Sequence, residues 1–173
     1  MSLLSPLGRR IVVLALLAAA VLGVIASSHG FEAAGYRPCR LCLEQRWVYY
    51  GSAPIAVFAL LAERLRAPEI LVRLALLALV GLFLWGGGVG FYQAGAEWGY
   101  WPGPADCSGA TATALPLSAA DMLNAARKAA VIDCTKAQLR ILGLSFAGWN
   151  VVISTGLVAL ALWGALKARR SAA

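Results

Sequence analysis

The sequence predicts an all-α integral membrane protein built as a four-helix transmembrane bundle. Three observations favour this fold class. Hydrophobic residues make up 61% of the 173 residues and charged residues only 13%, whereas soluble domains hold about 45–50% apolar and about 25% charged residues. The mean hydropathy is +0.75. The apolar residues gather into four long runs, so lipid is the expected solvent for most of the chain.

The first run, Ile11–Ala26, follows Arg9 and Arg10 and in that respect looks like a signal peptide. Its length and the runs that follow it favour an uncleaved first helix. The second run, Trp47–Leu61, is short. Extending it to residues 43–62 reaches the length of about 20 residues that crosses about 30 Å of hydrocarbon.

The third run begins at Ile70 and contains Arg73, whose long side chain can reach the membrane interface. Each run is expected to be helical, because an open strand leaves backbone groups unsatisfied in lipid. Gly86 and Gly90 in the third run have a spacing that allows close helix packing. We expect one membrane domain over residues 1–173, with spans at about 11–28, 43–62, 70–90 and 142–166.

Four spans place both termini on one side of the membrane. Lys and Arg are denser in the N-terminal segment, the 62–73 connection and the C-terminal tail than in the loops at 27–46 and 91–141. The positive-inside rule makes the denser side cytoplasmic. The net charge of +7 therefore reflects orientation, and no nucleic-acid partner is expected.

The second outer loop has two expected parts. Its start, Gly99–Pro104, is rich in Gly and Pro and should be extended and turn-rich. Further on, Ser118 and Asp121 have the spacing of a helix N-cap and its third residue, and apolar residues recur at helical spacing up to Ala130. This pattern predicts a short interfacial helix that holds the loop near the bilayer; packing against the bundle is the alternative.

All four cysteines fall in the outer loops, and two of them form the motif Cys39-Arg-Leu-Cys42. A c-type haem site would need His after the second cysteine, where Leu43 stands. A zinc site would need a second short cysteine pair, yet Cys107 and Cys134 are far apart. No metal is therefore expected, and a redox-active dithiol is the preferred interpretation.

The local sequence favours a reactive thiolate at Cys42. Pro38 disfavours helix just before the motif, so Cys42 lies near the N-terminus of the second helix, where the dipole stabilises a negative charge. Arg46 follows one helical turn later and adds a positive charge on the same face. Arg46 could equally anchor the helix to lipid phosphate.

Cys107 and Cys134 alone would suggest a structural disulfide. Beside a redox dithiol they favour a relay, in which one pair meets a soluble protein and the other meets an electron acceptor in the membrane. No haem, flavin or metal motif is present to take two electrons. A quinone dissolved in the bilayer is the simplest acceptor.

The four spans, the Pro38–Cys42 motif followed by Arg46, and the segment Trp101–Cys107 with a later Cys134 resemble the bacterial disulfide bond formation protein B (DsbB) family. The resemblance covers nearly the whole chain. It implies an inner-membrane oxidoreductase with both termini cytoplasmic and its cysteine loops periplasmic.

The resemblance also implies a role for each site residue. Cys107 and Cys134 would form the disulfide offered to a thioredoxin-fold thiol oxidase (DsbA-like), with Cys107 taking the mixed disulfide. Cys39 and Cys42 would reoxidise that pair, and Cys42 and Arg46 would face ubiquinone or menaquinone. The sequence does not choose between the two quinones, and it identifies neither the partner nor the oligomeric state.

One position departs from the family pattern. Related sequences often carry His where this chain has Gln93, and an amide cannot store a proton near neutral pH. Proton delivery is therefore expected from Glu97, water or bulk solvent. Two other functions stay open: a quinone oxidoreductase related to vitamin K epoxide reductase, and a non-enzymatic membrane protein with two structural disulfides.

Overall fold

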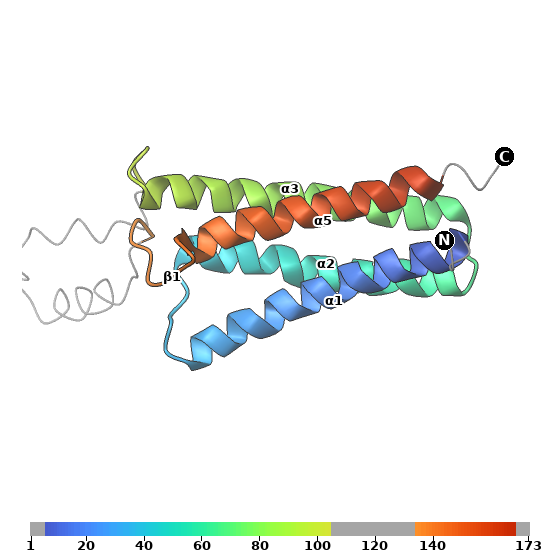
Figure 1. Cartoon of the computed structure of the whole chain (residues 1–173), viewed down its shortest axis with the longest axis horizontal. Coiled ribbons are helices and arrows are strands. Elements are labelled where there is room, and N and C mark those ends of the chain that lie inside the picture. The colour runs from blue at the N-terminus through green and yellow to red at the C-terminus, as the bar shows by residue number, and fades with distance from the viewer. Residues whose placement is uncertain (1–5, 105–133, 169–173) are drawn as a thin grey trace, which may run out of the picture.

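Helices dominate the computed structural model, which describes residues 6–104 and 134–168. The order of elements is α1 (Pro6–Ala33), α2 (Arg40–Arg64), α3 (Glu69–Glu97), β1 (Arg140–Ile141), β2 (Leu144–Ser145) and α5 (Phe146–Ala168). The four helices lie side by side along the long axis (Figure 1). α3 packs mainly against α5 and α2, and α1 packs mainly against α2.

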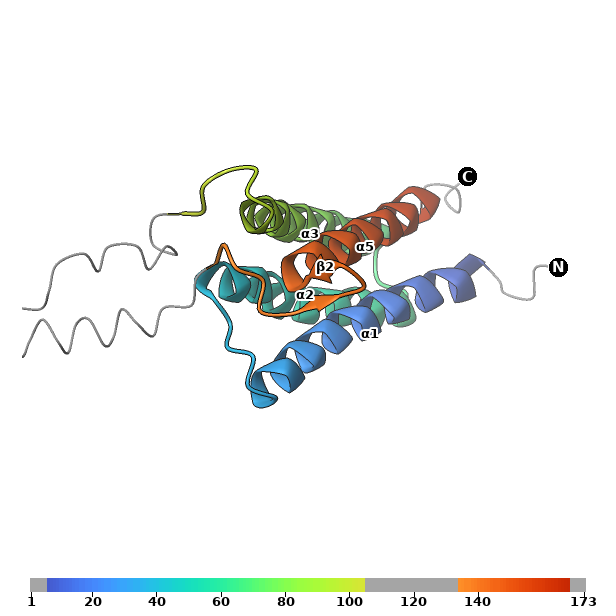
Figure 2. The same ribbon diagram turned by 60° about the vertical axis from the view of Figure 1, so that its left-hand side comes forward.

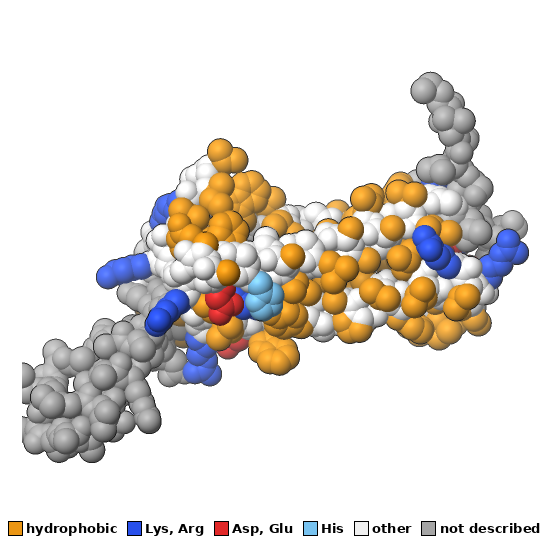
Figure 3. Space-filling view, turned by 90° about the horizontal axis from the view of Figure 1, so that it is seen from below, with side chains coloured by type: hydrophobic (Ala, Val, Ile, Leu, Met, Phe, Trp, Pro, Cys, Tyr) orange, Lys and Arg blue, Asp and Glu red, His pale blue; other side chains and the backbone are white. Residues whose placement is uncertain are grey.

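Three of the described helices are long and apolar enough to cross a membrane: α1 from Gly8, α3, and α5 as far as Leu166. Many large apolar side chains on these helices face outward; Leu84 and Trp85, for example, are 60% and 67% exposed. Hydrophobic side chains cover the middle of the face in Figure 3, and charged side chains gather toward its two ends. This distribution is that of a helical membrane protein.

The interior of the bundle is built from apolar side chains of all four helices. Each helix contributes residues that are nearly or fully inaccessible to solvent; they include Leu14, Leu17, Val21, Ala56, Ala59, Leu76, Leu79, Phe83, Leu157 and Ala161. The start of α1 and the end of α5 lie at one end of the bundle (Figure 1).

The helices extend beyond the apolar runs, most clearly in α3. A span ending near residue 90 was expected, yet α3 continues to Glu97. Gln93 and Ala96, on this added part, are buried at 3% and 5% exposure. The extension therefore places Gln93 and Glu97 on a helix, one turn apart, where the sequence placed them in a loop.

The predicted start of the last span, at about residue 142, is wrong, because α5 begins at Phe146. Residues 140–145 form an antiparallel hairpin that pairs Arg140 with Ser145. Leu142 and Gly143 make its turn with φ values of 53° and 85°, a left-handed conformation that interrupts a helix. The Ser145 hydroxyl then accepts the Gly148 N–H at 3.2 Å, which caps the first turn of α5.

The segment leading into β1 passes over the start of α2 (Figure 2). The Gln138 side chain donates a hydrogen bond to the Arg37 carbonyl at 2.6 Å, which ties this segment to the residues before α2. The predicted interfacial helix at 118–130 and Cys107 lie outside the described residues. The expected turns at Gly99–Pro104 are present.

Candidate redox site at the start of α2

The two cysteines of the Cys-x-x-Cys motif lie in the first turn of α2. Cys39 is the N-cap residue, with φ −78° and ψ 174°, and its sulfur accepts the backbone N–H of Cys42 at 3.2 Å. Cys39 is buried and Cys42 half-buried, and both are free thiols. The helix start therefore brings the two sulfurs together, as the spacing predicts.

The two thiols have different acidities. The hydrogen bond from the Cys39 thiol lowers the pKa of Cys42 to about 6, with help from the Gln93 amide and against the opposing effects of burial and of the Glu97 charge. The same thiol contact, together with burial, raises the pKa of Cys39. Cys42 is therefore the thiolate of the pair at neutral pH, and Cys39 keeps its proton.

Gln93 is the residue of α3 that meets both sulfurs. Its amide nitrogen lies 3.5 Å from the Sγ atoms of Cys39 and Cys42 and 3.1 Å from Glu97 Oε1. Its amide oxygen accepts from Gln45 Nε2 at 2.8 Å and lies 3.8 Å from Cys42 Sγ. The amide can thus donate to a Cys42 thiolate or accept from a Cys42 thiol.

Cys134 lies against this dithiol although it is far away in the sequence. It is 1% exposed and forms one buried cluster with Cys39 and Leu41, against which Cys42 and Val89 pack. Cys134 is disulfide-bonded, whereas Cys39 and Cys42 are free. An oxidised cysteine and a reduced pair therefore share one cluster, the arrangement that thiol–disulfide exchange requires.

A cavity of about 310 Å³ opens beside the two cysteines. It is enclosed by α1, α2, α3, the segment at 136–141 and the first turns of α5, and most of its wall is apolar. Polar side chains also line it, among them Cys39, Cys42, Gln45, Arg46, Tyr49, Gln93, Glu97 and Asn150. An apolar cleft with a few directed polar groups is the usual form of a small-molecule site.

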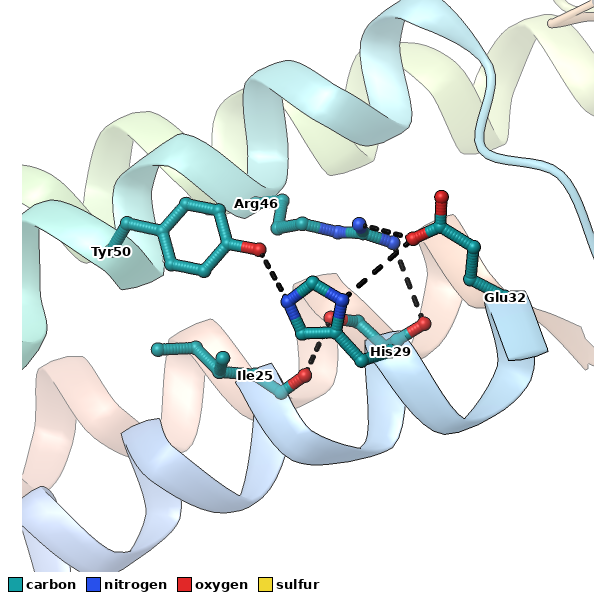
Figure 4. Close-up of polar contacts among 6 residues, drawn as sticks. Ile25, His29, Glu32, Arg46 and Tyr50 are labelled. Carbon is teal, nitrogen blue, oxygen red and sulfur yellow. Dashed lines mark hydrogen bonds and ion pairs between the residues drawn. The ribbon is translucent and has the colours of Figure 1, made fainter.

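Arg46 lines the same cavity, but its charge is turned toward α1 (Figure 4). The guanidinium donates to Glu32 Oε2 at 2.7 Å and to the Ser28 carbonyl at 3.4 Å. Next to this pair, His29 contacts the Tyr50 hydroxyl at 2.7 Å and Glu32 at 3.8 Å. Arg46 is thus part of the cavity wall, while the acidity of Cys42 comes from Cys39 and Gln93.

The deeper wall of the cavity carries a buried polar network. The Tyr49 hydroxyl donates to Asn150 Oδ1 at 2.5 Å and lies 3.2 Å from Ser154 Oγ. Asn150 Nδ2 donates to the Gly86 carbonyl at 2.9 Å. This network joins α2, α3 and α5.

Three polar residues of the site were not among the residues singled out from the sequence. Gln45 follows Cys42 by three positions, and this spacing, which places the two side chains on the same face of a helix, was a usable signal. Glu32 and Ser28 gave no such signal, because their contact with Arg46 joins two helices. Among the described residues, no cluster of three or more His, Cys, Asp or Glu side chains has the arrangement of a metal site.

Comparison with known proteins agrees with this chemistry. Residues 9–164 match the family model described as "Disulfide bond formation protein DsbB". No curated protein and no solved structure matches the chain. Because the family match covers most of the sequence, including all four cysteines and Arg46, the chain belongs to the DsbB family of disulfide-forming membrane oxidoreductases.

Proposed function

We propose that the chain is a thiol:quinone oxidoreductase of the bacterial inner membrane. It reoxidises a periplasmic thioredoxin-fold thiol oxidase (DsbA-like) and passes the electrons to ubiquinone or menaquinone. The formation of disulfides follows from membership of the DsbB family. The quinone, the partner and the periplasmic position of the cysteines belong to the proposal.

One observation carries the proposal: a free dithiol forms part of the wall of an apolar cavity and also packs against a disulfide-bonded cysteine. The dithiol can therefore react on two sides. It can exchange with Cys134, and it can give electrons to a molecule in the cavity. The burial of Cys39 against Cys134, together with the position of Cys39 and Cys42 in the wall of the cavity, favours a redox role over a purely structural one.

The cavity fits the head group of a quinone. Its volume of about 310 Å³ is at the lower end of the range for small-molecule sites, about 300–1,000 Å³. Val24, Ile25 and Ile153 supply apolar wall for a flat ring, and Arg46, Gln93 and Tyr49 supply polar groups for its oxygens. The chemistry that a bound quinone supplies is the uptake of two electrons and two protons, the number released when a dithiol becomes a disulfide.

The exchange steps balance without a further oxidant. A reduced partner attacks the Cys107–Cys134 disulfide at Cys107, leaves with its own disulfide, and leaves two thiols here. A Cys39–Cys42 disulfide then reoxidises that pair and becomes the free dithiol.

The orientation rests on charge. Arg9, Arg10, Arg64 and Arg66 lie at or near the end of the bundle opposite the cysteines, so the positive-inside rule makes that end cytoplasmic. In this topology α2 crosses the membrane between α1 and α3, in addition to the three helices that are long and apolar enough to do so. The cysteines then face the periplasm, the compartment in which disulfides persist.

The deciding experiment measures quinone reduction by the purified protein in the presence of a reduced thioredoxin-fold protein. Wild-type protein should reduce quinone, and Cys42→Ser should abolish the reaction. Cys107→Ser should stop exchange with the partner but leave Cys39 and Cys42 able to reduce quinone. No quinone-dependent turnover by the wild type, under conditions where a known family member works, would refute the proposal.

Arg46→Ala tests the cavity as the quinone site. We expect a higher KM for quinone because the Arg46 side chain forms part of the cavity wall, while exchange with the reduced partner stays near the wild-type rate. Arg40→Ala is a suitable control, since Arg40 lies at the same helix start, is exposed and pairs with Glu44, and is not among the residues that line the cavity. Unaltered quinone kinetics in Arg46→Ala would remove Arg46 from the quinone site.

A further inference from the structure

Gln93 and Glu97 form a polar pair on one face of α3, one helical turn apart. The Gln93 amide nitrogen donates to Glu97 Oε1 at 3.1 Å and lies 3.5 Å from each sulfur of the dithiol. Gln45 holds the amide oxygen at 2.8 Å, which sets the amide nitrogen toward the sulfurs and the carboxylate. Glu97 is therefore held close to the dithiol by a residue that touches the reacting atoms.

The second carboxylate oxygen of Glu97 has no hydrogen bond. Oε2 is buried and has no hydrogen-bond partner among the described residues, although a buried carboxylate oxygen normally has one. Glu97 lines the cavity. An unsatisfied acceptor at this position suits a group that receives a proton during the reaction better than one with a purely structural role.

Glu97 is also the one carboxylate among the described residues that line the cavity. The other charged side chains there are Arg37, Arg46 and Lys136, from the segment before α2, from α2 and from the segment before β1. Tyr36 and Tyr49 complete the titratable groups besides the cysteines. Of these groups, Glu97 is the one whose carboxylate can accept a proton and also contacts, through Gln93, the side chain that meets both sulfurs.

We propose that Glu97 is the proton carrier of this site, and that Gln93 is the positioning residue that holds the carboxylate and the two sulfurs together. The inference rests on the proposed quinone reduction and adds the route of the proton. It also explains how this chain works with an amide at residue 93. Gln93 directs hydrogen bonds without titrating, and the titratable group lies one turn further along α3.

The proton step concerns Cys39. Cys42 is already a thiolate at neutral pH, whereas buried Cys39 keeps its proton. When the S–S bond forms, the pair loses two electrons to the quinone and one proton from Cys39 Sγ. The Glu97 carboxylate takes that proton and passes it on to the acceptor in the cavity. The second proton that the acceptor takes up comes from bulk solvent, to which Cys42 released its own proton on ionising, so atoms and charge balance.

The first test measures turnover with quinone for Glu97→Gln, an isosteric change that keeps an acceptor for the Gln93 amide. We expect turnover to fall by about 10²-fold, the lower end of the usual contribution of a positioned acid–base group. Glu44→Gln is the matched control, because Glu44 lies near the same helix start, is exposed and pairs with Arg40. A Glu97→Gln turnover within about threefold of the wild type would overturn the inference.

Chemical rescue separates a proton carrier from a structural side chain. In Glu97→Ala, added formate should restore part of the turnover, because formate supplies a small carboxylate. Formamide has the same shape but accepts no proton at neutral pH, so it should not restore turnover. Equal rescue by both molecules, or by neither, contradicts the role of Glu97 as a proton carrier.

A readout on quinone-free protein tests the coupling between Glu97 and the dithiol. The Glu97 charge opposes ionisation of Cys42, so Glu97→Gln should move the pH midpoint of Cys42 alkylation downward, and Glu44→Gln should leave it in place. An unmoved midpoint in Glu97→Gln contradicts the inference. If the wild type reduces quinone and these tests fail, the inference alone is lost; if the wild type reduces no quinone, the proposed function is lost.

Discussion

At the scale of single residues, the site shows how position sets acidity. Cys39 is the N-cap of α2 and its sulfur accepts the Cys42 N–H, yet its thiol also hydrogen-bonds to Cys42 and holds the negative charge there. The sequence predicted a thiolate at Cys42 from the helix start. From the sequence, Arg46 was expected to stabilise this thiolate. In the structure Cys39 and Gln93 lower the pKa of Cys42, and Arg46 pairs with Glu32 instead.

The acidity of Cys42 gives a prediction for alkylation of the reduced protein by iodoacetamide. Only the thiolate reacts, and the pKa of Cys42 is lowered to about 6. The rate should therefore rise with pH up to about 6 and level off above it. Below this value it should fall about tenfold per pH unit, as expected for a single ionisation. Mass spectrometry assigns the label to Cys42.

Gln93→Leu should raise the pH midpoint of this reaction by about one unit, because a hydrogen bond to a charged group is worth about 1.5–3 kcal/mol and one pKa unit is about 1.4 kcal/mol. Gln138→Leu is the control; the Gln138 amide donates to the Arg37 carbonyl. An unshifted midpoint in Gln93→Leu would show that the amide does not stabilise the thiolate.

At the scale of elements, the apolar runs located the helices but not their ends. The end of α3 and the start of α5 depend on neighbours: Gln93 is buried by contacts with α2, and Ser145 caps α5 after a left-handed turn. Hydropathy does not register such contacts. The sequence therefore assigned residues 91–97, which belong to α3, to a loop. It divided the hairpin at residues 140–145 between that loop and the last span.

Close packing of α3 against α5 gives a prediction at Gly90. A Cβ atom there would lie 2.8 Å from Asn150 Nδ2 and 3.2 Å from the Ala147 carbonyl, so Gly90→Ala forces the helices apart or breaks the Asn150 network. We expect a loss of about 1–3 kcal/mol, measured by thermal unfolding of the protein in detergent.

Gly81→Ala on the same helix is the matched control, because a Cβ atom at Gly81 meets nothing within 4 Å. Its thermal midpoint should equal or exceed that of the wild type, since Ala favours a helix over Gly. Similar losses at both positions would show that helix propensity, not packing against α5, decides the effect.

At the scale of the whole molecule, the proposed topology requires α2 to cross the membrane. α2 is less apolar than the other three helices, since its first turns carry the polar residues of the site. It is 25 residues long, and at about 1.5 Å per residue this length is enough to span the hydrocarbon.

Reporter fusions test this crossing. Alkaline phosphatase fused after Arg66 or at the C-terminus should be inactive, and fused after Pro104 it should be active, because the enzyme requires an oxidising compartment. A fluorescent protein that requires the cytoplasm should give the reverse pattern. High phosphatase activity after Arg66 would place the α2–α3 connection on the outer side and exclude the four-span topology.

The sequence by itself determined the membrane class and the positions of the helices, and it predicted a redox role for the Cys-x-x-Cys motif, because hydropathy and helix-start signals act over short stretches of chain. Only the tertiary structure decided which residues share the site. Cys134 packs against Cys39, and Glu32 forms an ion pair with Arg46. Gln93 contacts Gln45, Glu97 and both sulfurs. These contacts connect segments far apart in the chain, and packing of one helix against another creates them.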